Sequence, residues 1–245
     1  MTKKILAIDI GGSNIRFAKV SGKEISDFVI KKTPKNKKDL LACLLREIRK
    51  VSKKEKNIGI SCAGLIKNGK VIKSPNLSLK NFDLQGFVEK NLKKRVRVEN
   101  DARCAALAEM KFGIKKKNFI ILILGTGIGG GIIVNGKLYK GKSNAGEFGH
   151  FILDNKKDFE KLYQNARGKE EKTIEVLGEG IASLISILNP EAIVLSGGLR
   201  ENVGKNFLTK LKRRIRKYSF MEVLPEIKWS NFRNHGLIGA GLLFN

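Results

Sequence analysis

The chain has 245 residues, of which 42% are hydrophobic, so it can bury one large core or two modest ones. Apolar runs stay well below the roughly eighteen residues that a membrane span needs, so we expect a cytoplasmic protein without a membrane partner. Three cysteines and two histidines, widely spaced, do not fit a disulfide framework or a cysteine-based metal site.

The charge is strongly positive: 49 Lys and Arg oppose 23 Asp and Glu, which gives a net charge of +26. Such a charge attracts polyanions, so nucleic acid is a candidate partner. The lysines are scattered, however, and do not alternate with aromatic residues as in a base-stacking surface. We therefore expect a solvated basic surface, with nucleic acid binding limited to non-specific electrostatic attraction.

The first hundred residues alternate between strand-like and helix-like segments. Apolar runs at 5–10 and 15–20 flank the turn Gly11-Gly12-Ser13-Asn14, which predicts two strands joined by a glycine turn. The elements predicted after them are a strand at 25–31, a helix at 39–51, a strand at 58–63, loops and short hairpins at 64–81, a helix at 83–92 and a strand at 95–99. A helix beginning at Asp101 follows.

The second half repeats the opening pattern. An apolar run at 119–124, a glycine turn at 125–131 and an apolar run at 132–134 again predict two strands around a turn. The later predictions are a helix at 173–188, a strand at 192–196 that runs into Gly197-Gly198, a basic helix at 201–217 and a small-residue helix from Gly236. The repetition indicates a duplicated α/β domain.

Three glycine turns follow predicted strands. Glycine lets backbone amides approach phosphate oxygens, because no side chain blocks them. Each turn alone is equally explained as a structural hairpin, but the three together favour a nucleotide cleft. Neither a Walker A sequence nor a dinucleotide-binding fingerprint is present, since the run after Gly127 leads into a strand instead of a helix.

Two aspartates stand out as candidates for chemistry. Asp101 lies where a strand ends and a helix begins, so it is either a general base facing a cleft or a simple helix N-cap. Asp9 lies inside an apolar strand, where an unpaired carboxylate is costly. We expect it to meet a cation or hydrogen-bond donors; the alternative is a buried, hydrogen-bonded structural aspartate.

Three polar residues in loops are weaker candidates. Glu147 and His150, three apart after Gly146, can face one cavity, or the glutamate can pair with one of the many lysines. Asn76 follows Pro75, so a role in a turn competes with one in ligand binding. The small residues from Gly236 to Gly241 are better explained by close helix packing than by a ligand site.

Five motifs, in order, resemble those of the ROK family of sugar kinases, which belongs to the actin/hexokinase/Hsp70 superfamily. The segments 9–16 and 124–131 resemble the family's two phosphate motifs, and Glu99-Asn100-Asp101-Ala102 resembles its catalytic motif. The segment 141–150 resembles the sugar-contacting segment, and 189–198 resembles the nucleotide-side strand and turn.

The resemblance implies a duplicated actin-like ATPase fold, related to ribonuclease H, with two domains around a nucleotide cleft. It implies transfer of the ATP γ-phosphate to a hexose or amino sugar, most simply at the 6-hydroxyl, with Asp101 as general base. Asp9 would act on Mg²⁺ through a water molecule, and Asn76, Asn100 and Glu147 would hold sugar hydroxyls. The implied ATP-binding residues are Gly11, Gly12, Ser13, Asn14, Gly125, Thr126, Gly127, Gly197 and Gly198.

The sequence departs from the family after His150. The cysteines that bind structural zinc in the family are absent, so no zinc is expected, and His150 becomes a sugar contact or a packed side chain. Glu160 is a candidate for the family's last sugar-binding glutamate. The region 151–188 is shorter than usual, which leaves open whether it supports catalysis, which sugar binds and whether the chain forms a homodimer.

The expected domains are residues 1–98, rejoined by a helix at 236–245, and residues 99–235. The first phosphate motif begins at Asp9, without space before it for a DNA-binding helix-turn-helix, so a repressor is not expected. Two alternatives to a kinase stay open: a non-catalytic sugar or nucleotide sensor with this fold, and a basic nucleic-acid-binding protein.

Overall fold

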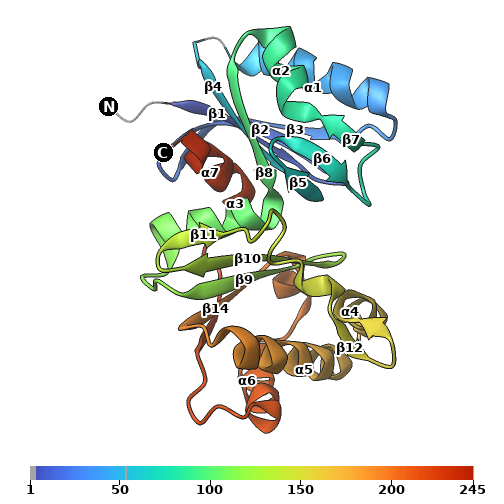
Figure 1. The fold of residues 1–245 in the computed structure, drawn as a ribbon, viewed down its shortest axis with the longest axis vertical. Coiled ribbons are helices and arrows are strands. Elements are labelled where there is room, and N and C mark those ends of the chain that lie inside the picture. Colours follow the sequence, from blue (N-terminus) through green and yellow to red (C-terminus); the bar gives the residue numbers. More distant parts are fainter. Residues whose placement is uncertain (1–3, 53, 245) are drawn as a thin grey trace. The chain divides into compact units, whose positions relative to one another are not determined.

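A computed structural model describes residues 4–52 and 54–244. The chain forms two compact units (Figure 1). The first contains the chain up to Gly113, the segment 141–144 and the chain from Phe232 onward, and the second contains 114–140 and 145–231. Residues 99–113 thus fall in the first unit, although a boundary at 98 was expected, because helix α3 (Asp101–Ala108) packs on helix α7 (His235–Gly241).

A five-stranded sheet forms the centre of the first unit. Its strands, in spatial order, are β3 (Glu24–Lys32), β2 (Asn14–Ser21), β1 (Ile5–Ile10), β4 (Asn57–Cys62) and β8 (Arg95–Asn100). The first three are antiparallel, whereas β1, β4 and β8 are parallel. The register places Asp9 beside Ser61 and Ser61 beside Glu99, so these three side chains share one face of the sheet.

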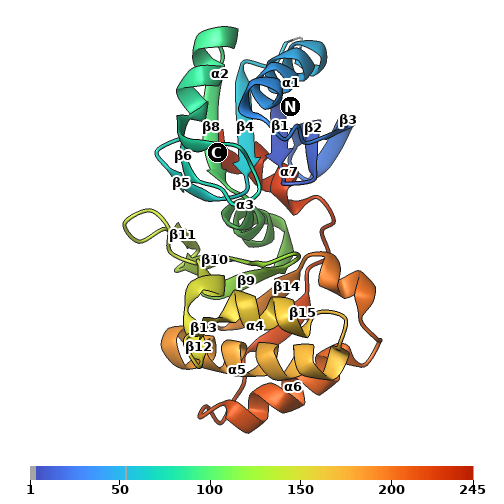
Figure 2. The same cartoon turned by 90° about the vertical axis from the view of Figure 1, so that its right-hand side faces the viewer.

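The two faces of this sheet are covered differently (Figure 2). Leu6, Ile8 and Ile60 pack in the apolar core that includes helices α1 (Lys37–Val51) and α2 (Leu84–Leu92). The opposite face packs on α7, and α7 in turn packs on α3, both at very short range. A Cβ on Gly59 would lie 1.9 Å from the Ala240 carbonyl oxygen, and one on Gly239 would lie 1.8 Å from that of Cys104. The small residues of α7 thus serve close packing.

The rest of the first unit extends these elements. A small antiparallel sheet joins β5 (Leu65–Lys67), β6 (Lys70–Lys73) and β7 (Lys80–Asp83), where loops and short hairpins were predicted. A π-helical turn, Glu109–Gly113, continues α3, and a 3₁₀ turn, Leu242–Phe244, follows α7.

The second unit repeats the sheet of the first. Its strands, in order, are β11 (Lys137–Tyr139), β10 (Ile128–Val134), β9 (Phe119–Leu124), β14 (Ala192–Ser196) and β15 (Glu226–Trp229). The first three are again antiparallel and the last three parallel. The duplicated α/β fold is therefore confirmed. The sequence analysis missed β15, and it assigned Gly129–Gly131 to a turn although they belong to β10.

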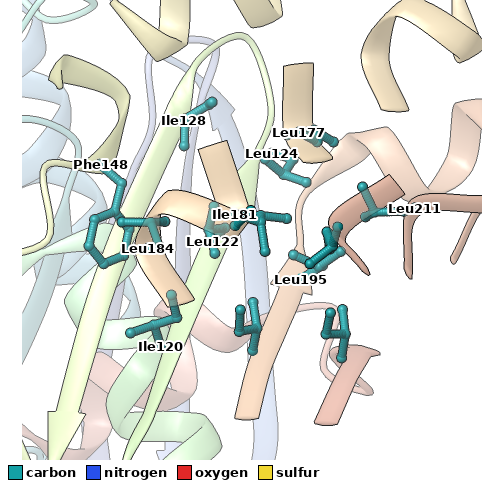
Figure 3. Close-up of a cluster of buried hydrophobic side chains, with 14 of the residues drawn as sticks. Ile120, Leu122, Leu124, Ile128, Phe148, Leu177, Ile181, Leu184, Leu195 and Leu211 are labelled. Carbon is teal, nitrogen blue, oxygen red and sulfur yellow. The ribbon is translucent and has the colours of Figure 1, made fainter. Parts of the chain in front are cut away.

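Helices α4 (Phe159–Ala166), α5 (Glu170–Leu188) and α6 (Phe207–Tyr218) complete the second unit. Its core joins Leu122 of β9 and Leu195 of β14 to Ile181 of α5 and Leu211 of α6 (Figure 3). The basic helix predicted from residue 201 is divided: a 3₁₀ turn spans Gly198–Asn202 and α6 begins at Phe207. The remaining elements are a 3₁₀ turn, Phe148–His150, and the strands β12 (Ile152–Asp154) and β13 (Lys157–Asp158).

None of the helices in the described part of the chain combines the length and the apolar character that crossing a membrane requires.

Candidate active site

The carboxyl ends of β1, β4 and β8 gather polar side chains in the first unit. Asp9, near the end of β1, forms an ion pair with Arg16 (Oδ2 to Nη1, 3.0 Å) and accepts a hydrogen bond from the Ser61 hydroxyl (2.8 Å). Its side chain is 16% exposed. The carboxylate thus meets both a cation and a donor, as its place in an apolar strand required.

The first turn of α7 lies against Asp9. A Cβ on Gly236 would lie 2.7 Å from Asp9 Oδ1, so only glycine lets the helix begin there. Burial lowers the pKa of the neighbouring His235, while its contact with the Phe232 carbonyl and the charge of Asp9 act in the opposite direction.

Asp101 is not the N-cap of α3. Asn100 caps the helix, since its Oδ1 accepts the Arg103 backbone N–H (3.1 Å). Asp101 Oδ1 accepts from the Ala102 N–H (2.9 Å) and from Asn100 Nδ2 (3.1 Å). The capping interpretation of Asp101 was therefore wrong, and its carboxylate instead is oriented by its immediate neighbours at the carboxyl end of β8.

Asn100 is buried and connects three segments. Besides capping α3 and contacting Asp101, its Nδ2 donates to the Gly64 carbonyl (3.0 Å). The buried thiols nearby are chemically quiet, because burial, with the charges of Asp101 and Asp9 adding to it, raises the pKa of Cys62 and of Cys104. The thiols at this edge of the sheet are therefore held in their neutral form.

The first glycine turn is tied down by a threonine. Thr33 Oγ1 donates to the Gly11 carbonyl (2.6 Å) and its N–H donates to the Ser13 carbonyl (3.0 Å). A Cβ on Gly12 would lie 2.6 Å from the Cβ of Asn76, so the structure brings Asn76 to this turn. Thr33 was missed by the sequence analysis, because a threonine between a strand and a proline carries no distinctive pattern.

The other two glycine turns lie together in the second unit. Gly125–Gly127 follows β9 and Gly197-Gly198 follows β14, its parallel neighbour. Gly197 has φ of 98°, and a Cβ there would lie 2.5 Å from the Leu124 carbonyl oxygen. Gly125 and Gly198, by contrast, have open space where a Cβ would stand. Two of the three proposed phosphate turns are therefore adjacent and accessible.

Helix α4 holds the turn at 125–127 through three side chains. Glu160 Oε2 accepts the Ile128 N–H (2.7 Å), Tyr163 donates to the Gly125 carbonyl (3.3 Å) and Gln164 Nε2 donates to the Thr126 carbonyl (3.1 Å). The candidate Glu160 thus lies directly at a glycine turn. Tyr163 and Gln164 were missed, although their spacing from Glu160 places all three on one side of a helix.

The segment that carries Glu147 packs its backbone closely against strand β10. Gly146 has φ of 99°, and its Cβ would lie 2.8 Å from the Gly130 carbonyl oxygen. Phe148 is buried against the same strand. Gly130 within β10 therefore makes room for the segment that carries Glu147.

His150 is not a packed side chain. It is 60% exposed, and its Nδ1 lies 4.0 Å from Asp158 Oδ2. A Cβ on the preceding Gly149 would lie 3.2 Å from Glu160 Oε2, so the residue before His150 packs against the Glu160 side chain.

The candidates therefore form two groups. The first unit holds Asp9, Asn76, Asn100 and Asp101 with the turn at 11–14, and the second holds Glu147, His150 and Glu160 with the turns at 125–127 and 197–198. Across the described residues, no three His, Cys, Asp or Glu side chains cluster as a self-sufficient metal site.

Known proteins similar to this chain include sugar kinases. A glucokinase of Halalkalibacterium halodurans is 27% identical over 97% of this chain and 94% of its own length. That alignment extends over 313 positions, more than the 245 residues of this chain, so the glucokinase carries segments that are lacking here. An N-acetylgalactosamine kinase of Shewanella sp. is 28% identical over 96% of this chain and 95% of its own length.

Repressors have a similar sequence identity to the chain. A xylose repressor of Caldicellulosiruptor bescii is 27% identical over 91% of this chain but only 73% of its own length. Among solved structures, a ROK family glucokinase of Streptomyces griseus, in complex with glucose and AMPPNP, has a TM-score of 0.85 and 23% identity and covers 98% of each chain.

The fold has thus the architecture of an actin-like ATPase. The sequence model of the ROK family matches residues 5–169, which is more than half of the chain. The chain therefore belongs to the ROK family.

Proposed function

We propose that the protein is an ATP-dependent sugar kinase that phosphorylates a hexose or amino sugar, as a glucokinase does, at the 6-hydroxyl. The observation that carries the proposal is the turn Glu99-Asn100-Asp101. There the helix is capped by Asn100, and the next carboxylate stands at the carboxyl end of a parallel strand, where ligands bind in open α/β sheets. Full-length relatives that are named sugar kinases support the same function.

Asp101 acts as general base in this proposal and accepts the proton of the attacking hydroxyl as the bond to phosphorus forms. The sugar is held by Asn76, Asn100, Glu147, His150 and Glu160. The backbone amides of the turns at 11–14, 125–127 and 197–198 bind the ATP phosphates in this proposal.

The residues present fit a Mg²⁺ ion only if water and substrate phosphates supply most of its ligands. Asp9 already pairs with Arg16 and Ser61, and the described residues offer no cluster of acids beside it. Mg²⁺ keeps several waters and commonly uses one or two carboxylates plus substrate phosphates. Asp9 would therefore contact it through water, and the metal would supply neutralisation of phosphate charge.

The test is ADP formation with ATP and a panel of hexoses and N-acetylhexosamines. A kinase forms ADP only with its sugar, and the sugar also raises the melting temperature. If purified, folded protein forms no ADP with any sugar of the panel, the proposal is contradicted.

A sugar sensor is the second candidate, because a xylose repressor aligns with 91% of this chain. A sensor would be stabilised thermally by a sugar without forming ADP. A nucleic-acid-binding protein would instead show strongly salt-dependent binding to DNA or RNA and no response to sugars.

A further inference from the structure

The most voluminous fully buried side chain of the described residues is an arginine. Arg103 lies in α3 and is 1% exposed. Removing a guanidinium group from water is unfavourable unless ion pairs and hydrogen bonds replace its hydration. The structure supplies these partners on two sides of Arg103.

On one side, Arg103 supports the turn that carries Asp101. Its Nε lies 3.1 Å from Glu99 Oε1, and the same carboxylate oxygen accepts the Asn100 N–H (2.9 Å). Asn100 in turn accepts from the Arg103 N–H and donates to Asp101 Oδ1. A continuous set of hydrogen bonds therefore runs from the guanidinium to the proposed base.

On the other side, Arg103 holds the segment 141–144. Its Nη1 donates to the Ser143 carbonyl, and its Nη2 donates to Asn144 Oδ1 (3.3 Å) and to the Ile66 carbonyl (3.4 Å). This segment belongs to the first unit, although the chain on both sides of it belongs to the second. Three residues beyond Asn144 the chain reaches Glu147.

We propose that Arg103 is a positioning residue that holds two parts of the site at once: the base turn at 99–101 and the segment that leads to the sugar-side residue Glu147. This inference rests on the proposed kinase function and adds a residue to it. Only a planar fork with separate donors can serve Glu99, Ser143 and Asn144 together, so lysine is a poor replacement.

Variants at the two sides of Arg103 should separate in their kinetics. Glu99→Gln disturbs the base turn and should mainly lower kcat. Asn144→Ala removes a contact near Glu147 and should mainly raise the KM for the sugar. Arg103→Lys should do both, by about 10- to 100-fold in kcat/KM, since displacements near 1 Å have effects of this size. The KM for ATP should change by less than about twofold, because none of these three residues is proposed to contact ATP.

The control is Lys19→Met, which breaks a partly buried ion pair with Asp27 and Glu55 outside the candidate site. It should lower the melting temperature and leave kcat and both KM values unchanged. Normal sugar kinetics in folded Arg103→Lys and Asn144→Ala would overturn the inference, and so would kinetic changes of the same size in Lys19→Met.

Hydrogen exchange tests the positioning role of Arg103 without a measurement of enzyme activity. Arg103→Lys should increase amide exchange at 100–102 and 143–147 above that of Lys19→Met, and equal exchange would count against the positioning role. If wild-type protein forms no ADP with any sugar, the kinase proposal fails, while hydrogen exchange and sugar binding still decide whether Arg103 holds these segments.

Discussion

The two units contain separate sheets of the same topology and differ in which groups lie at the carboxyl edge of each sheet. In each, three antiparallel strands are followed by two that run parallel, in the same spatial order. The first unit places charged and amide side chains at that edge: Asp9, Asn100 and Asp101. The second places two adjacent glycine turns there, with space beside Gly125 and Gly198.

The same strand order thus carries different chemical groups at its carboxyl edge in the two units. Carboxylates exchange protons and attract cations, whereas exposed backbone amides bind anionic oxygens. A phosphoryl transfer needs both, and in the proposed function the first unit supplies the acid while glycine turns of both units supply the amides. Substitutions in the two units should therefore affect different kinetic constants.

The largest effect is expected for Asp101→Asn in the first unit. Loss of the base should lower kcat by about 10²- to 10⁴-fold with little change in sugar binding. Asp39→Asn is the matched control, because Asp39 also lies in the first turn of a helix behind an asparagine cap. Unchanged turnover in Asp101→Asn would remove Asp101 from its role.

The next largest effect is expected on the free energy of unfolding. Gly239→Ala places a methyl group against the Cys104 carbonyl and should destabilise the first unit by about 1–3 kcal/mol, as overpacking commonly does. Gly204→Ala has only the end of a glutamate side chain nearby and is the control. Denaturant unfolding measures both, and equal stability of the two variants would contradict the close packing of α7.

A smaller effect should separate two adjacent glycines of the second unit. Gly197→Ala adds a side chain at a positive φ and against Leu124, and should lower stability by about 1–2 kcal/mol. Gly198→Ala has space and should leave the melting temperature unchanged while raising the KM for ATP. An unaltered ATP KM would argue against a phosphate role for this turn.

The smallest effect is expected at Glu160. Glu160→Ala removes the acceptor of the Ile128 N–H and should lower stability by about 0.5–1.5 kcal/mol, as for a typical hydrogen bond. Glu160→Gln retains an acceptor oxygen and should be nearly as stable as the wild type. A sugar KM that rises in Glu160→Gln would support sugar contact, and an unchanged one would limit Glu160 to holding the turn.

Local patterns were sufficient for much of the fold. Alternating or apolar runs around glycine turns identified the paired strands β1 and β2 and, except for the start of β10, β9 and β10. Gly129–Gly131 were misassigned because glycine usually marks a turn, whereas Gly130 here makes room for Gly146 and Phe148. That reason is a tertiary contact, which no local pattern reveals.

The candidate site shows the same limit. The motif at 99–102 identified Asp101, but only coordinates show that Asn100 is the helix cap. Arg103 was overlooked because an arginine in a helix is normally a surface residue, and its partners Ser143 and Asn144 lie forty residues away along the chain. Thr33 and Gln164 likewise act through contacts distant in sequence.

In the function that we propose, the acid of the first unit and the amides of the second serve one transfer from ATP to a sugar hydroxyl. Phosphorus NMR of the products, with the sugar that gives the fastest ADP formation, tests it most directly. We expect one phosphomonoester on the hydroxymethyl carbon of the sugar, formed in equal amount with ADP. Sugar and ATP that both bind while no phosphomonoester forms would contradict it.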